Sequence, residues 1–95
     1  MSVSQTSVHF QESGGRLQAV EVLRSNSRPI ISALHRTLFA AGVVITSYRV
    51  QTTSGGLRER MELASLSGQA LTDQQSEQVR SATLPLAWDA ESDTH

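Results

Sequence analysis

The middle of the chain predicts a β-hairpin, and this feature limits the possible folds more than any other. Residues 43–52 form a run rich in β-branched side chains, which favours a strand. Residues 53–56 read Thr-Ser-Gly-Gly, a composition typical of a tight turn. Residues 57–66 then alternate apolar and charged side chains, as a strand with one buried face does. The centre of the chain is therefore predicted to form antiparallel sheet.

A strand and a helix are predicted before this hairpin. Residues 16–23 carry β-branched side chains in partial alternation and indicate a strand. Ser27 is expected to cap the helix, with Pro29 in its first turn, where a missing N–H is tolerated. Gly42 provides the left-handed residue that ends it. The apolar residues that recur at helical spacing, and so predict its buried face, are Ile30, Ile31, Leu34, Leu38 and Ala41.

A second helix is predicted after the hairpin. Thr72 and Gln75 fit a capping box, in which each side chain binds the backbone N–H of the other residue. The helix is expected over residues 73–84 and to end before Pro85, because proline disfavours the helical conformation in the residue before it. Residues 86–88 fit either a last short strand or a packed coil. The predicted order is strand, helix, strand, strand, helix, with an optional final strand, which indicates an α+β domain with both helices on one face of an antiparallel sheet.

Length and composition predict one small domain. The chain has 95 residues, no cysteine and a formal net charge of −1. We expect the domain to span residues 8–88, between a disordered N-terminus (1–7) and a disordered acidic tail (89–95). No segment has the length and apolarity of a membrane span or a secretion signal, so a cytoplasmic location and no membrane contact are expected. The near-neutral charge argues against nucleic-acid binding, which usually needs a basic surface.

Catalytic and metal-binding patterns are missing from the sequence. The three histidines are scattered and have no carboxylate at ligand spacing, so no metal site is expected. Glu59 and Glu62 stand three residues apart on a strand, so they point to opposite faces and cannot act as a pair. The glycine pairs of the chain are not followed by the lysine of a phosphate-binding loop. We therefore expect a protein that is not an enzyme and needs no cofactor.

Three segments resemble the ACT domain family. Residues 27–32, Ser-Arg-Pro-Ile-Ile-Ser, open the first helix, and residues 40–45, Ala-Ala-Gly-Val-Val-Ile, lead into the next strand. Residues 68–71, Gly-Gln-Ala-Leu, resemble the family's element after the hairpin. The pattern is most similar to the ACT pair at the C-terminus of the nitrogen-regulatory protein uridylyltransferases, and it covers about residues 19–84.

The resemblance implies a ferredoxin-like βαββαβ fold that pairs with a second copy. It also implies an amino acid bound at the pair interface, near the turn between the first strand and the first helix. This chain departs from the family at Ile30, where the family has glycine, because a β-branched side chain fills the space that such a ligand would use. A second departure is the short segment available for the last strand. We expect Val8–Phe10 to take that place, by pairing antiparallel with residues 17–23 through the turn at Gly14 and Gly15.

Two sets of residues are candidates for binding. The helix start attracts anions, so an amino acid or other anion is expected beside Ser25, Asn26, Ser27, Arg28 and Ile30. The residues expected to form an interface are Phe39, Tyr48, Arg49, Arg58 and Arg60. The three arginines lie on the hairpin and suit an acidic partner, although a solvated face with cross-strand ion pairs explains them too.

The function expected from the sequence is that of a non-catalytic ACT-like regulatory module. It is expected to act through homodimerisation and protein–protein interaction. The alternative is a sensor of an amino acid or other anion that binds near the first strand–helix turn, at a dimer interface.

Overall fold

The computed structural model describes residues 6–25, 29–54 and 56–92 of the 95. The elements are β1 (Thr6–Ser13), β2 (Arg16–Arg24), α1 (Ile31–Ala40), β3 (Val43–Thr53), β4 (Gly56–Ser65) and α2 (Asp73–Ser92). They form an α+β fold with a four-stranded antiparallel sheet and two helices, compatible with a ferredoxin-like fold. In the described residues, no helix is long and apolar enough to cross a membrane.

The sheet is built from two hairpins that meet at β2 and β4. Its strand order is β1-β2-β4-β3, so β1 and β3 lie at the two edges. The central hairpin is confirmed, with Tyr48 of β3 opposite Met61 of β4. The N-terminal hairpin is confirmed as well, because Val8 lies opposite Val22 and Phe10 opposite Val20. The edge beside β2 is therefore occupied by a strand from the N-terminus.

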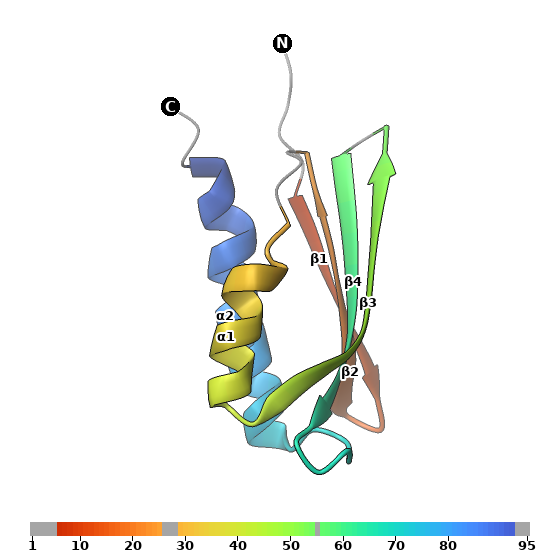
Figure 1. Ribbon diagram of the computed structural model, residues 1–95, viewed down its shortest axis with the longest axis vertical. Coiled ribbons are helices and arrows are strands. Elements are labelled where there is room, and N and C mark those ends of the chain that lie inside the picture. Colours follow the sequence, from red (N-terminus) through yellow and green to blue (C-terminus); the bar gives the residue numbers. More distant parts are fainter. Residues whose placement is uncertain (1–5, 26–28, 55, 93–95) are drawn as a thin grey trace.

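Both helices lie on the same side of the sheet, and the core lies between them and the strands (Figure 1). Leu34 and Leu38 of α1 are buried at the spacing that the sequence predicts. Side chains of alternate strand residues meet them from the sheet, among them Val20 and Val22 of β2 and Met61 of β4. No helix of the described residues lies over the opposite face of the sheet (Figure 1), which is called the open face below.

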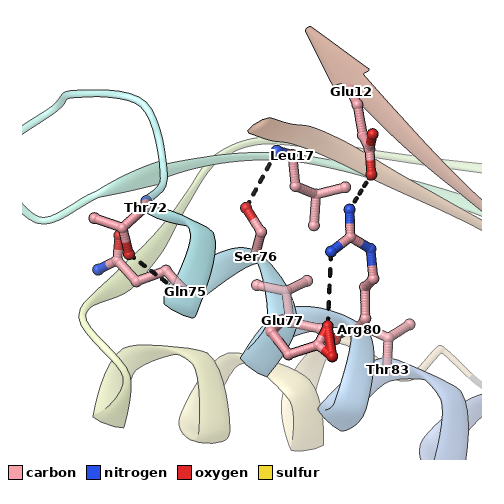
Figure 2. A network of polar contacts seen from close by, with 9 residues as sticks. Glu12, Leu17, Thr72, Gln75, Ser76, Glu77, Arg80 and Thr83 are labelled. Carbon is pink, nitrogen blue, oxygen red and sulfur yellow. Dashed lines mark hydrogen bonds and ion pairs between the residues drawn. The ribbon is translucent and has the colours of Figure 1, made fainter. Parts of the chain in front are cut away.

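The second helix is fixed to the sheet by polar contacts as well as by apolar ones (Figure 2). The capping box is confirmed, because Gln75 N donates to Thr72 Oγ1 and Thr72 N donates to Gln75 Oε1, each at 3.0 Å. Leu17 N of β2 donates to the buried Ser76 Oγ at 3.2 Å. Arg80 forms an ion pair with Glu12 of β1. These contacts hold a helix whose apolar face is weak.

The first helix begins later than the sequence predicts. Its N-cap is Ile30, without a capping side chain, so Pro29 precedes the helix and does not lie in its first turn. The expected cap, Ser27, lies outside the described residues. A carboxylate from β4, described below, binds the N–H of Ile30. The contact of Ile30 with β4 is thus a tertiary one, whereas the sequence pattern predicts a local cap at the start of this helix.

The second helix continues past Pro85, so the predicted end at residue 84 and the optional strand at 86–88 are both wrong. Proline inside a helix removes one hydrogen bond and costs roughly 3 kcal/mol. Burial favours continuation nevertheless, because Val79, Thr83 and Ala87 are fully buried along one helix face. The edge of the sheet that a last strand would use is already filled by β1.

Gly56, the first residue of β4, tests how closely β4 approaches the end of β2. Its φ is +137°, and a Cβ there would lie 1.9 Å from the carbonyl oxygen of Arg24. We expect Gly56→Ala to lower the free energy of unfolding by about 3 kcal/mol or more, because backbone must move and positive φ is strained. Urea denaturation monitored by circular dichroism measures this loss.

The matched control is Gly14→Ala. Gly14 also has positive φ, at +61°, but nothing lies within 4 Å of the added Cβ. We expect Gly14→Ala to lower the free energy of unfolding by about 1 kcal/mol, because only the strain of a positive φ acts there. Equal losses for the two variants would refute the close approach of β4 to the end of β2.

Candidate functional site

Glu59 of β4 is buried beneath the start of α1. Its exposed fraction is 1%, and it lies on the helix-facing side of the sheet between Val22 of β2 and Val50 of β3. Ile30 N donates to Glu59 Oε1 at 3.0 Å and to Oε2 at 3.1 Å. Tyr48 Oη donates to Oε2 at 2.9 Å. One carboxylate therefore joins α1, β3 and β4.

This carboxylate lies at the helix start, where the sequence predicts an external anion. The first N–H groups of a helix lack partners inside it and carry partial positive charge, so they attract anions. Here Glu59 binds the N–H of Ile30, at the N-cap of α1. Of the five residues predicted around the anion, Ser25 is exposed and Ile30 is buried, while Asn26, Ser27 and Arg28 lie outside the described residues.

Arg24 adds a second buried charged side chain at this end of the sheet. Its exposed fraction is 1%, and it lies opposite Thr6 of β1 and Leu57 of β4. Arg24 and Glu59 share the helix-facing side of neighbouring strands, at diagonal positions. A buried charge is costly unless it is paired or hydrogen-bonded. The core therefore ends in a polar region between the end of β2 and the start of α1, a feature that is not among the predictions above.

A signal for both residues was present in the alternation of the strands. Glu59 has the same parity along β4 as Leu57, Met61 and Leu63, which are buried. Arg24 has the parity of Val20 and Val22 along β2. A charged residue at a core position of a strand predicts a buried polar contact, because a lone buried charge is too unfavourable to retain.

Tyr48 is half-buried at the sheet edge, beside this carboxylate. Burial raises the pKa of Tyr48 from 10.0 to about 12, and the hydrogen bond to Glu59 and its negative charge act in the same direction. The phenol therefore stays protonated, and it serves as a hydrogen-bond donor through the neutral pH range.

The open face of the sheet carries the arginines that the sequence marks as an interface. Arg49 of β3 lies directly opposite Arg60 of β4, and Arg58 lies on the same face two residues before Arg60. Arg60 donates to Gln11 Oε1 of β1 at 2.8 Å and lies 3.9 Å from Glu62. Glu62 is exposed on the open face and Glu59 is buried under the helices, so their spacing places them on opposite sides as predicted.

The other arginines of this face are exposed. Within the described part of the chain, Arg49 and Arg58 have no ion pair. A hollow of about 390 Å³ opens beside Arg60 and Glu62. The remaining side chains around it are mostly polar or small, and they include Gln11, Gln18, Thr46 and Gln69.

Apolar side chains border the other side of β3. Phe39 of α1 has an exposed fraction of 55%, and its ring stacks on that of His35 at 6.2 Å between centroids, so it is not a core residue. Val50 of β3 has an exposed fraction of 45% on the helix-facing side. Of the five residues predicted as an interface, Tyr48 and the three arginines lie on β3 and β4, whereas Phe39 lies near the end of α1. No group of three residues able to hold a metal ion occurs among the described residues.

Removal of the charge at residue 59 should destabilise the protein strongly. Hydrogen bonds to a charged group contribute about 1.5–3 kcal/mol each, and Glu59 accepts them from two elements. We expect Glu59→Gln to lower the free energy of unfolding by about 2–3 kcal/mol. The exposed Glu62→Gln is the control and should change it by less than about 0.5 kcal/mol. Equilibrium unfolding that gave the same small change for both would contradict the internal contact.

Ionisation of Tyr48 should report on the same contact. A raised pKa means that the folded state holds the proton more tightly, so this contribution to stability is full below pH 10 and is lost between pH 10 and about 12. Because Tyr48 is the only tyrosine, tyrosinate absorbance follows it directly. We expect a midpoint of about 12 in the folded protein and about 10 in urea.

Two variants separate the causes of this shift. Glu59→Gln should move the midpoint only part of the way back, since burial is the largest cause. Tyr48→Phe should abolish the absorbance change and the associated loss of stability. A folded-state midpoint of about 10 would show that Tyr48 is not held by Glu59.

Comparisons with protein-family models, with curated proteins and with solved structures gave no significant match. The similarity to ACT domains therefore rests on the sequence segments quoted above.

Proposed function

We propose that this chain is a non-catalytic, ACT-like regulatory module that acts by binding other protein chains, as a homodimer that also docks a separate partner. The order of elements from β2 to α2 supports the fold assignment, since it is strand, helix, strand, strand, helix. The strands β2, β4 and β3 are adjacent in the order of a ferredoxin-like sheet, with β1 in place of the final strand.

The observation that carries this proposal is the contact between Glu59 and Ile30. In the family that the sequence resembles, a small ligand binds at the turn between the first strand and the first helix. In this chain, the carboxylate of Glu59 binds the N–H of Ile30 there, and the Ile30 side chain is buried. An external carboxylate would have to displace an internal one, which favours action through the protein surface.

The helix layer is the surface that suits a second copy. A hollow of about 370 Å³ lies between α1 and α2. None of the residues around it is charged: Thr37, Leu38, Ala40, Ala41, Gln78, Ser81 and Ala82. A two-fold interface brings the same patch of both copies together, so a charged patch would repel itself and a neutral one does not. We propose that homodimers form through this hollow.

Sedimentation velocity tests the homodimer. We expect the protein to sediment as a dimer at high micromolar concentration, and Ala40→Arg to sediment as a monomer, because the substitution places two like charges in the interface. Ala40 is the last residue of α1, where a cation suits the helix dipole, so the variant should fold. His35→Arg, on the other flank of α1, is the control and should remain dimeric.

Two outcomes would count against the proposal. The first is a strict monomer at high micromolar concentration. The second is a specific rise in melting temperature with one amino acid or nucleotide in a thermal-shift screen, because a ligand that binds only the folded state stabilises it by mass action. That result would favour the alternative, a small-molecule sensor at the β2–α1 turn.

A further inference from the structure

Among the described residues no strand pairs with the outer edge of β3, where the charge of Arg49 and one bulge near Thr46 are the features that discourage pairing. β3 is an edge strand of 11 residues, Val43–Thr53, without proline, lysine or an acidic residue. Its register shifts between Ile45 and Ser47, so the regular segment that follows is residues 47–52. Natural edge strands are usually blocked by charges, prolines or bulges, because their free N–H and C=O groups otherwise pair with other chains. We call residues 47–52 the β3 edge.

One side of the β3 edge has an excess of positive charge. Arg49 lies opposite Arg60 on the open face, and like charges directly opposite each other destabilise a sheet. Arg60 is engaged by Gln11 and Glu62. Arg49 and Arg58 have no such contact within the described residues. A carboxylate from outside would relieve this repulsion.

The other side of the β3 edge is apolar. Val50 is 45% exposed, and Tyr48 is half-buried next to it on the same side. Phe39 is 55% exposed on α1, and Thr37, Ala40 and Ala41 face α2 around the hollow, so helical spacing places Phe39 on the flank away from α2. Phe39 lies at the end of α1 and so near the start of β3, whereas the start of α1 contacts Glu59, which pairs with Val50. The apolar side of the β3 edge therefore consists of Val50 and Tyr48.

A second copy of this chain does not satisfy the β3 edge. The strand contains no aspartate or glutamate, so pairing of two such edges adds arginines to the same sheet face and provides no carboxylate. A partner strand with alternate acidic and apolar residues fits both sides, since successive side chains of a strand point to opposite faces. Nucleic acid fits less well, because no phenylalanine, tyrosine or tryptophan for base stacking lies on the described part of the open face.

We propose that the β3 edge binds an extended segment of another protein, with alternating acidic and apolar residues, by adding it as a fifth strand. The acidic side chains of that segment face Arg49 and Arg58, and its apolar side chains cover Val50 and Tyr48. Backbone hydrogen bonds provide affinity and the alternation provides specificity. This inference rests on the proposed function and names the partner that the module docks.

A labelled peptide of alternating Glu and Val residues is the probe, with binding followed by fluorescence anisotropy at low salt. The protein should bind it, and should not bind the peptide in which Lys replaces Glu. Arg49→Glu should weaken binding at least about ten-fold and gain binding of the Lys peptide. The variant should fold, because it replaces a cross-strand repulsion by an attraction.

Arg16→Glu is the matched control. It makes the same change in net charge at an exposed arginine of β2, away from β3, and should leave affinity within about two-fold, since exposed charges are screened over distance. Equal loss in the two variants would overturn the proposal in favour of general charge attraction. Binding of a single-stranded RNA as tight as that of the Glu peptide would overturn it too.

Backbone methylation tests the added strand itself. In a two-stranded pairing, alternate N–H groups of the peptide point towards β3, so methylation of one alternate set should abolish binding and methylation of the other should not. Equal binding of both methylated peptides would overturn strand addition. A protein that sediments as a dimer but does not bind the Glu peptide overturns this inference alone, and a monomer that binds it overturns only the homodimer.

Discussion

The contact between Glu59 and the start of α1 is the interaction on which the rest of the site depends. A buried carboxylate needs hydrogen-bond donors, and a helix start needs acceptors, so each satisfies the other. Glu59 meets this need from β4, and the same carboxylate accepts from Tyr48 of β3. It thereby fixes the first helix over β3 and β4. The outer edge of β3 and the open face of both strands are the surfaces that we assign to a partner.

Most of the fold followed from local patterns in the sequence. The central hairpin, the N-terminal hairpin and the buried face of α1 were predicted because alternation, glycine turns and helical spacing are local signals. The burial of Glu59 and Arg24 was not predicted, although their parity along the strands places them in the core, because their contacts depend on tertiary packing. The continuation of α2 through Pro85 was not predicted because it depends on tertiary packing. Ala87 is buried against the rest of the core, and β1 fills the sheet edge that a last strand would use.

The candidate interface shows where local prediction stops. The predicted interface residues come from α1 and the hairpin: Phe39, Tyr48, Arg49, Arg58 and Arg60. The register brings the three arginines together on the open face, while Phe39 lies apart near the end of α1. That Arg49 stands opposite Arg60 depends on the register, which the bulge near Thr46 shifts by one residue. A shift of one residue moves every following side chain of a strand to the other face, so Arg49 lies on the open face because of that bulge.

Charge then separates the two surfaces that we assign to binding. A patch that meets its own copy must tolerate like residues in contact, and the hollow between α1 and α2 is uncharged. A patch with an excess of positive charge repels its copy and favours a different, acidic chain, and we assign this role to the β3 edge, where Arg49 lies near Arg58 and Arg60 of β4. The two surfaces lie on different sides of α1, so a dimer formed through the helix layer leaves both of its β3 edges free. Self-association and partner docking are therefore compatible in one small domain.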